Sequence, residues 1–127
     1  MSLTRLARRR HFHIPAANLT PADWPSGESP LLAPVFTPNG PAQALELEAF
    51  FEGAPDSDGM IVNLSEVDDL LSQVLKPIEA GQIVAKTPEH LVTHIADEII
   101  HTKARGAARL IKARLYMSQD FWVDIWP

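Results

Sequence analysis

The stretch "TPNGPAQALELEAFFEG", residues 37–53, carries the clearest secondary-structure signal in the chain. Hydrophobic side chains occupy alternate positions of its second half: Leu45, Leu47, Ala49 and Phe51. This alternation predicts a half-buried strand over 44–52 that ends at Gly53. The first half, "PNGP" at 38–41, has no ionisable group and predicts a loop at the start of the strand.

The flanking segments predict further strands and one long irregular segment. Residues 3–14 mix apolar and basic side chains and could form a first strand. Residues 20–43 are rich in proline, and a connection of this length inside a compact domain is typical of a functional lid, a site wall or a disordered insertion. After 44–52, the turn "GAPDSDG" leads into "MIVNL" at 60–64, which predicts a hairpin partner for the strand.

Two amphipathic helices follow. Ser65 and Asp68 resemble a capping box, and the helix that they start is expected to end at Pro77. Its apolar positions recur at helical spacing: Val67, Leu70, Leu71, Val74 and Leu75. The second helix is expected to begin after Thr87 as N-cap, with Pro88 at its first position, and to end at Gly106. Its expected buried stripe is Leu91, Val92, Ile95, Ala96 and Ile99.

The tail predicts two strands, 107–117 and 121–126, joined as an antiparallel hairpin. Strands on both sides of two consecutive helices indicate an α+β fold, in which an antiparallel sheet has two helices packed on one face. The other face then needs a cover. Phe50, Trp122 and Trp126 are candidates for burial against neighbouring chains, so we expect a homo-oligomer.

Composition sets limits on function. The chain has 127 residues, 46% of them hydrophobic, which fits a single domain over 1–127 with the Pro-rich loop at about 20–43. There is no cysteine, and so no disulfide, thiolate nucleophile or Cys-based metal site. No apolar run is long enough for a membrane helix, and the start "MSLTRLARRR" lacks a secretory signal, which predicts a cytoplasmic protein.

Charge argues weakly against nucleic acid as a partner. The formal net charge is −5, although four arginines lie close together near the N-terminus: Arg5, Arg8, Arg9 and Arg10. These arginines are expected to be solvated. The alternative is that they bind an anion or an acidic face of a neighbouring subunit.

Several stretches together resemble the 6-pyruvoyl tetrahydropterin synthase and 6-carboxytetrahydropterin synthase family. "DGMIVNLSEVDDLL" is similar to its strand-into-helix segment, "KTPEHLVTHIADEI" to its Pro-Thr-x-Glu-Asn-Leu helix start, and "RLYMSQDFWVDIW" to its closing hairpin. The resemblance covers nearly the whole chain in element order. It implies the T-fold, an antiparallel four-stranded sheet with two helices packed on one face. It also implies ring-like oligomers with active sites at subunit interfaces, a pterin or purine-derived ligand, and zinc held by three histidines.

The resemblance also implies that the family's chemistry is missing here. The family's His-Gly-His falls on "NGP", so Asn39 and Pro41 replace two zinc ligands, and Asn18 stands at the third. An Asn amide is a poor zinc ligand and proline offers no ligand atom. No cysteine is present, and the segment expected to supply an Asp-His pair, "KPIEAGQIVAK", has Glu79 as its only acid. We therefore expect no zinc or other cofactor.

Four residues are candidate ligand-binding positions: Gln119, Glu89, Asn18 and Asn39. Gln119 falls where the family places a ring-anchoring Glu, and its amide can still pair with a ring edge through one donor and one acceptor. Glu89 matches the family's Glu at the second helix start, but it could instead complement the helix dipole. No metal-binding residue and no catalytic residue is assigned.

Other clusters have simpler interpretations. His90, His94, Asp97 and His101 share one face of the second helix, which is expected to be a solvated polar face rather than a metal site. His11 and His13 are expected to line one face of the first strand, as alternate strand residues do; the alternative is that they contribute to a site with Arg9. The carboxylates of the central stretch are expected at a solvated edge or outer face: Glu46, Glu48 and Glu52.

Three hypotheses of function follow. The first is a divergent homologue of 6-pyruvoyl tetrahydropterin synthase without zinc-dependent lyase activity, which binds a pterin- or purine-like small molecule at subunit interfaces. The second is an active synthase-type lyase with non-standard residues, His11 or His13 among them. The third is a non-catalytic assembly or partner-binding protein.

Overall fold

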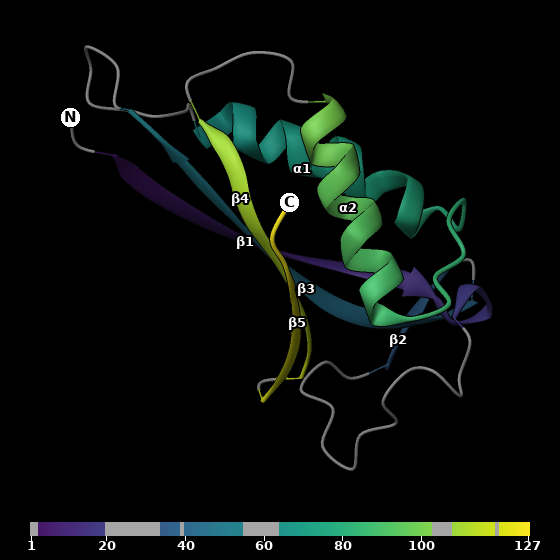
Figure 1. Ribbon diagram of the computed structural model, residues 1–127. Coiled ribbons are helices and arrows are strands. Elements are labelled where there is room, and N and C mark those ends of the chain that lie inside the picture. Colours follow the sequence, from purple (N-terminus) through teal and green to yellow (C-terminus); the bar gives the residue numbers. More distant parts are fainter. Residues whose placement is uncertain (1–2, 20–33, 39, 55–63, 103–107, 119) are drawn as a thin grey trace.

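The computed structural model describes residues 3–19, 34–38, 40–54, 64–102, 108–118 and 120–127 (Figure 1). The described residues form strands, α-helices and one short 3-10 helix in this order: β1 (Thr4–Pro15), η1 (Ala16–Asn18), β2 (Pro34–Thr37), β3 (Gly40–Gly53), α1 (Leu64–Glu79), α2 (Pro88–Thr102), β4 (Arg109–Ser118) and β5 (Phe121–Ile125).

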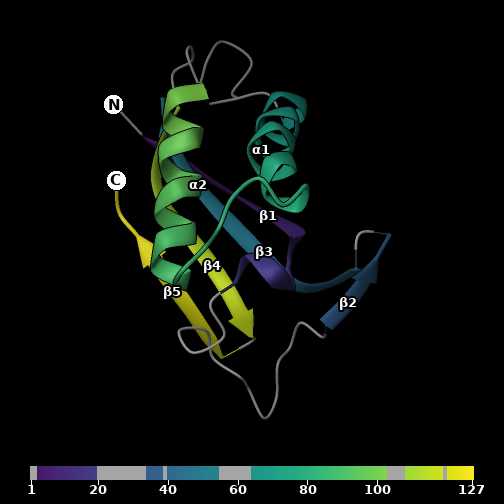
Figure 2. The same cartoon turned by 90° about the vertical axis from the view of Figure 1, so that its right-hand side faces the viewer.

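The strands form one antiparallel sheet with the order β1-β3-β4-β5. β1 pairs with Ala42–Gly53 of β3, and β4 pairs with Glu46–Glu52 of the same strand. β2 pairs with the first four residues of β3, on the side of β3 opposite β1. Both helices cover one face of this sheet, which leaves the opposite face, named here the open face, without helices (Figure 2).

β3 is the central strand, and its alternation is as predicted. Leu45, Leu47, Ala49 and Phe51 are each at most 1% exposed and point toward the helices. Glu46, Glu48, Phe50 and Glu52 therefore lie on the open face and are half-buried. The three glutamates thus occupy the outer face, one of the two places predicted for them, and they lie on the central strand rather than at a sheet edge.

The start of β3 differs from the sequence-based prediction. Gly40 and Pro41, which were expected in a loop over 38–41, begin β3 and pair with Thr37 and Phe36 of β2. β2 and residues 40–43 are thus strands inside the expected loop at 20–43. Gly40 has φ = +109°, a conformation that glycine adopts without strain. Residues 55–63 lie outside the described part of the chain. Of the predicted strand at 60–64, the structure describes only Leu64, which is the first residue of α1.

Helix α1 extends two residues beyond its expected end. Pro77 lies inside the helix, near its C-terminus, and Ser65 is its second residue rather than its cap. The helix closes with a Schellman motif, in which the amide of Gln82 donates to Pro77 O and the amide of Gly81 donates to Ile78 O. Gly81 has φ = +78°, as this motif requires. The motif satisfies terminal carbonyls, so the helix ends at Glu79.

The buried stripes of both helices form the core with β3 and β4. Four of the five residues of the buried stripe predicted for α1 are buried, and the fifth, Leu70, is partly buried and packs against the core. In α2 all five expected residues are buried. The N-cap is confirmed, because the amide of His90 donates to Thr87 Oγ1 at 3.1 Å. The predicted end at Gly106 lies outside the described residues, and α2 is described as far as Thr102.

The structure therefore confirms an α+β fold with an antiparallel sheet and two helices on one face, and it adds β2 as a fifth, short strand. The closing hairpin of β4 and β5 is confirmed as antiparallel. In the part of the chain that the structure describes, neither helix has the length and apolar character needed to cross a membrane.

Candidate functional site

Asn18 lies at the end of β1, in η1, and connects this end of the sheet to the segment between the helices. Its Nδ2 donates to Gly81 O at 2.8 Å and to Ile83 O at 2.9 Å. Its backbone carbonyl accepts from the amide of Ala85 at 2.9 Å. Both amide protons of the side chain are thus used within the protein, and the residue works as a clamp between η1 and the connection from α1 to α2.

His13 and Glu79 form a second contact at the same end. His13 Nδ1 is 3.1 Å from Glu79 Oε2, and the two side chains are 31% and 34% exposed. Glu79 is two residues before Gly81, which belongs to the Asn18 clamp. The pair thus joins β1 to the last residue of α1 close to Asn18.

No contact among the described residues places the other predicted ligand-binding residues beside Asn18 and His13. Glu89 is exposed in the first turn of α2, as a residue that complements the helix dipole would be. Gln119 and Asn39 lie outside the described residues. The roles predicted for these three positions stay predictions.

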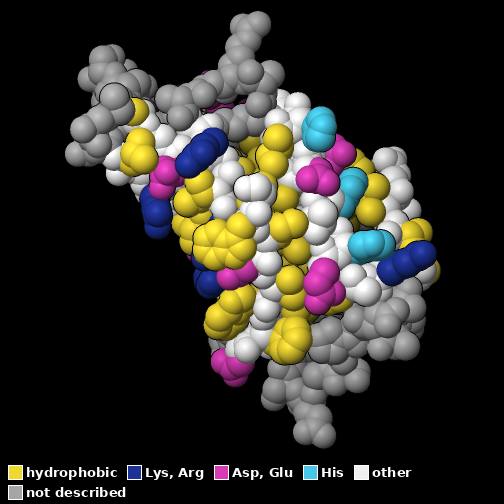
Figure 3. Space-filling model, in the orientation of Figure 1, with side chains coloured by type: hydrophobic (Ala, Val, Ile, Leu, Met, Phe, Trp, Pro, Cys, Tyr) yellow, Lys and Arg dark blue, Asp and Glu magenta, His cyan; other side chains and the backbone are white. Residues whose placement is uncertain are grey.

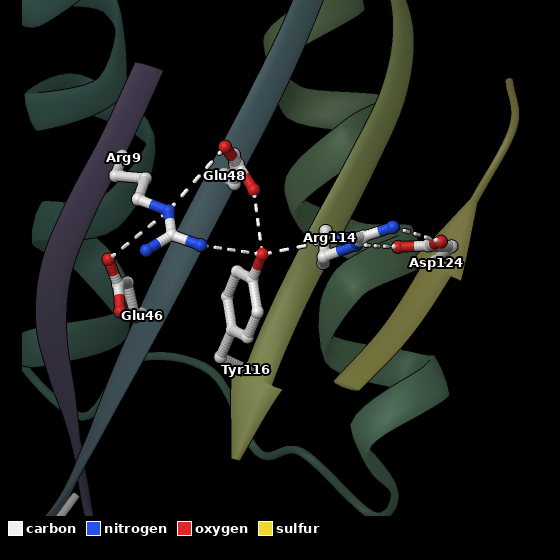
Figure 4. Close-up of polar contacts among 6 residues, drawn as sticks. All are labelled: Arg9, Glu46, Glu48, Arg114, Tyr116 and Asp124. Carbon is white, nitrogen blue, oxygen red and sulfur yellow. Dashed lines mark hydrogen bonds and ion pairs between the residues drawn. The ribbon is translucent and has the colours of Figure 1, made fainter. Parts of the chain in front are cut away.

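The open face of the sheet holds a polar network that runs across four strands (Figure 4). Tyr116 on β4 is at its centre. Its hydroxyl donates to Glu48 Oε1 at 2.8 Å and accepts from Arg9 Nη2 at 2.8 Å and from Arg114 Nη1 at 3.3 Å. Arg9 Nε also lies 3.5 Å from Glu48 Oε2 and 3.7 Å from Glu46 Oε1.

A bidentate ion pair continues the network to the edge strand. Arg114 Nε donates to Asp124 Oδ1 at 2.7 Å, and Nη2 donates to Asp124 Oδ2 at 3.1 Å. This planar arrangement is the strong form of an arginine–carboxylate contact. The hydrogen bond to Asp124, followed by that to Tyr116, raises the pKa of Arg114 above its ordinary value. The hydrogen bond to Tyr116 likewise raises the pKa of Arg9.

Aromatic rings and cations alternate beside this network. Lys112 Nζ lies 4.2 Å from the centre of the Phe50 ring and 4.8 Å from that of Trp126. The Arg114 guanidinium lies 4.8 Å from the Trp122 ring centre. Trp122 and Trp126 remain 45% and 67% exposed, so this part of the open face is an apolar and cationic surface without a cover in the described chain.

The N-terminal arginines are held by partners within the chain. Arg8 makes two hydrogen bonds to the Asp68 carboxylate, and Arg10 donates to Asp68 O and to Ser72 Oγ on α1. Arg5 and Arg9 pair with the glutamates of β3 on the open face. The four cations thus tie β1 to α1 and to β3. Their internal pairing weakens the alternative that they form an anion site.

The polar face of α2 is solvated, as expected (Figure 3). His90, Asp97 and His101 are exposed and His94 is half-buried. His101 Nδ1 contacts the carbonyl oxygen of Asp97 at 2.6 Å, one helical turn earlier. Across the described residues, no three His, Asp or Glu side chains are arranged so that they could hold a metal ion.

Glu52 connects two arginines and should affect the acid stability of the protein. Its Oε2 accepts from Arg5 Nε at 3.0 Å, and its Oε1 lies 3.6 Å from Arg109 Nη2. The hydrogen bond from Arg5 and then the two positive charges lower the pKa of Glu52 below its ordinary value of 4.5. A carboxyl whose pKa is lower in the folded state stabilises the protein above its unfolded pKa, and this stabilisation is lost as the pH falls through the folded pKa.

We therefore expect the variant Glu52→Gln to lose stability less steeply than the wild type between about pH 5 and pH 2. The measurement is the urea midpoint at a series of pH values. Glu98→Gln is the control, because Glu98 is exposed on α2 and has no ion pair within the described chain. An equal change of slope in both variants would contradict the role of the arginines.

Comparison with known proteins shows a likeness among solved structures. No family model matches the sequence, and no curated protein matches it. Among solved structures, Caenorhabditis elegans 6-pyruvoyl tetrahydropterin synthase matches with a TM-score of 0.69, over 100% of this chain and 97% of that chain, at 14% identity. An identity this low shows a shared fold and leaves activity open. The chain has the α+β T-fold of that synthase.

Proposed function

We propose that this protein is a divergent relative of the 6-pyruvoyl tetrahydropterin synthases that binds a pterin- or purine-like heterocycle and does not use zinc. The shared fold supports the relationship, since it extends over the whole chain. We further propose that the protein is a cytoplasmic homo-oligomer and that the ligand lies at a subunit interface.

The proposal that the protein does not use zinc is supported best by the hydrogen bonds of the Asn18 side chain. The resemblance places a zinc-binding histidine at this position. Here both side-chain N–H groups donate to backbone carbonyls of the segment between the helices. An amide nitrogen has no free lone pair for a metal, and this one is already oriented by two acceptors. The position therefore serves to hold the connection before α2.

The test is metal analysis together with a thermal-shift screen. We expect less than about one zinc per ten chains after purification without chelator, and a rise in melting temperature with pterin or guanosine at concentrations above Kd. Adenosine serves as the control ligand, because it lacks the lactam N–H and carbonyl of the other two. Stoichiometric zinc, or no response to any heterocycle, would contradict the proposal.

A second candidate function is assembly without a ligand. The exposed aromatic side chains on and beside β5 favour it: Phe121, Trp122 and Trp126. Together with the unpaired outer edge of β5 in the described chain, they form a surface that a neighbouring chain could cover. Light scattering in the same samples separates the two functions. An oligomer without any ligand response favours assembly.

A further inference from the structure

His13 is held by a carboxylate from a distant part of the chain. Its Nδ1 is 3.1 Å from Glu79 Oε2. Because an ionised carboxylate can only accept hydrogen bonds, the contact is a hydrogen bond when Nδ1 carries the proton. In the neutral imidazole, Nε2 is then the nitrogen with the free lone pair. Within the described part of the chain, no other hydrogen bond of His13 is present to occupy Nε2.

Among the described residues, no neighbour of His13 blocks this lone pair from an outside partner. The residue opposite His13 on β3 is Ala44, which brings no charge against the ring. On α1, Glu79 is the charged group in contact, and Lys76 lies one turn earlier and is exposed. Both members of the pair are about one-third exposed. A small ligand can therefore reach the ring without displacing the core.

The pair also lies beside the Asn18 clamp. Pro15, two residues after His13, lies beside Gly81, and Gly81 is two residues after Glu79. Asn18 donates to Gly81 O. The backbone of 79–83 is thus fixed from two directions, by the Schellman motif and by Asn18. A fixed backbone holds Glu79 in place, and Glu79 in turn orients the imidazole.

We propose that His13 is a ligand-binding residue, whose Nε2 accepts a hydrogen bond from the lactam N–H of a planar heterocycle. Glu79 is the positioning residue that selects this tautomer. A carboxylate on the far side of the imidazole also makes Nε2 a stronger acceptor. The choice of heterocycle rests on the proposed function, whereas the tautomer and the orientation of His13 rest on the His13–Glu79 contact alone.

The first measurement needs no ligand. Long-range ¹H–¹⁵N correlation spectra of the wild type, above the pH at which imidazoles are protonated, should show His13 mainly with the proton on Nδ1. Glu79→Gln keeps an acceptor and should keep this tautomer, whereas Glu79→Leu should shift His13 toward the proton on Nε2. His11 is the internal control, because it lies two residues earlier on β1 and has no described carboxylate contact. A wild-type His13 with its proton mainly on Nε2 overturns the inference.

The second measurement uses guanosine and N1-methylguanosine, which lacks the lactam N–H. We expect the wild type to bind guanosine roughly 10- to 100-fold more tightly, as loss of one hydrogen bond in a recognition site predicts. His13→Phe should remove this difference and His11→Phe should keep it. Equal effects of the two variants overturn the role of His13 and leave the proposed function standing. Absence of any binding of guanosine and pterin to the wild type overturns both. Binding of zinc to the wild type that His13→Phe abolishes would show a metal ligand instead and also overturn the inference.

Discussion

Replacing Phe51 with alanine will lower the free energy of unfolding by about 3–5 kcal/mol, the range for a fully buried Phe→Ala change. Phe51 is 0% exposed and lies on the central strand, where its ring faces the helices. Truncation leaves a cavity between the sheet and the helices, which neighbouring side chains only partly fill. Urea denaturation followed by far-UV circular dichroism gives the change in free energy.

Phe50→Ala is the matched control, because Phe50 is the adjacent residue and points to the open face. Its ring contacts Lys112 and lies 5.8 Å from the Arg114 guanidinium. Loss of these partly solvated contacts should cost about 1 kcal/mol. Equal losses in the two variants would mean that the alternation of β3 is not as described. A larger loss for Phe50 in an oligomeric sample would instead indicate that a neighbouring chain covers the open face.

The contrast between the two phenylalanines was predictable because alternation is a local signal. The same holds for α2, whose cap and buried stripe all fall within a few residues of one another. Local signals gave a wrong prediction for the end of α1. Pro77 predicted a helix end, yet α1 includes Pro77 in its last turn and ends two residues later, at Glu79, where a Schellman motif satisfies the terminal carbonyls.

Pairing between distant segments could not be read from the sequence. The predicted partner of the 44–52 strand was the next segment, 60–64, since neighbours in sequence often form hairpins. In the structure β1 and β4 occupy both edges of that strand. Glu46 and Glu48 therefore lie on the central strand, where both carboxylates are paired with Arg9 of β1. The Tyr116 hydroxyl of β4 donates to Glu48.

The same limit applies to the candidate site. The alternation of Lys112, Arg114 and Tyr116 along β4 was a signal for a polar face, but their partners come from β1, β3 and β5. His13 was predicted to share a strand face with His11. Its contact with Glu79, 66 residues away, depends on how α1 packs against β1. The resemblance identified Asn18 as a site position, but only the fold shows the two carbonyls that it holds.

Replacing Asn18 with leucine will lower the free energy of unfolding by about 2–4 kcal/mol, because two partly buried carbonyls lose their donor at once. These acceptors are Gly81 O and Ile83 O, both in the connection before α2. Asn18→Asp keeps the shape of the side chain and replaces the donor with a negatively charged acceptor. The oxygen that replaces Nδ2 would then face two carbonyl oxygens, so we expect a loss at least as large as that of the leucine variant.

Urea denaturation measures both variants, and amide hydrogen exchange at Ala85 reports on the clamp itself, since this amide donates to Asn18 O. Gln82→Ala is the control, because Gln82 is exposed on the same connection and its side chain has no described partner. Surface changes of this kind stay within about 0.5 kcal/mol. If Asn18→Asp is as stable as the wild type, the amide is not the donor described. The position would then be free to contact a ligand or a metal ion.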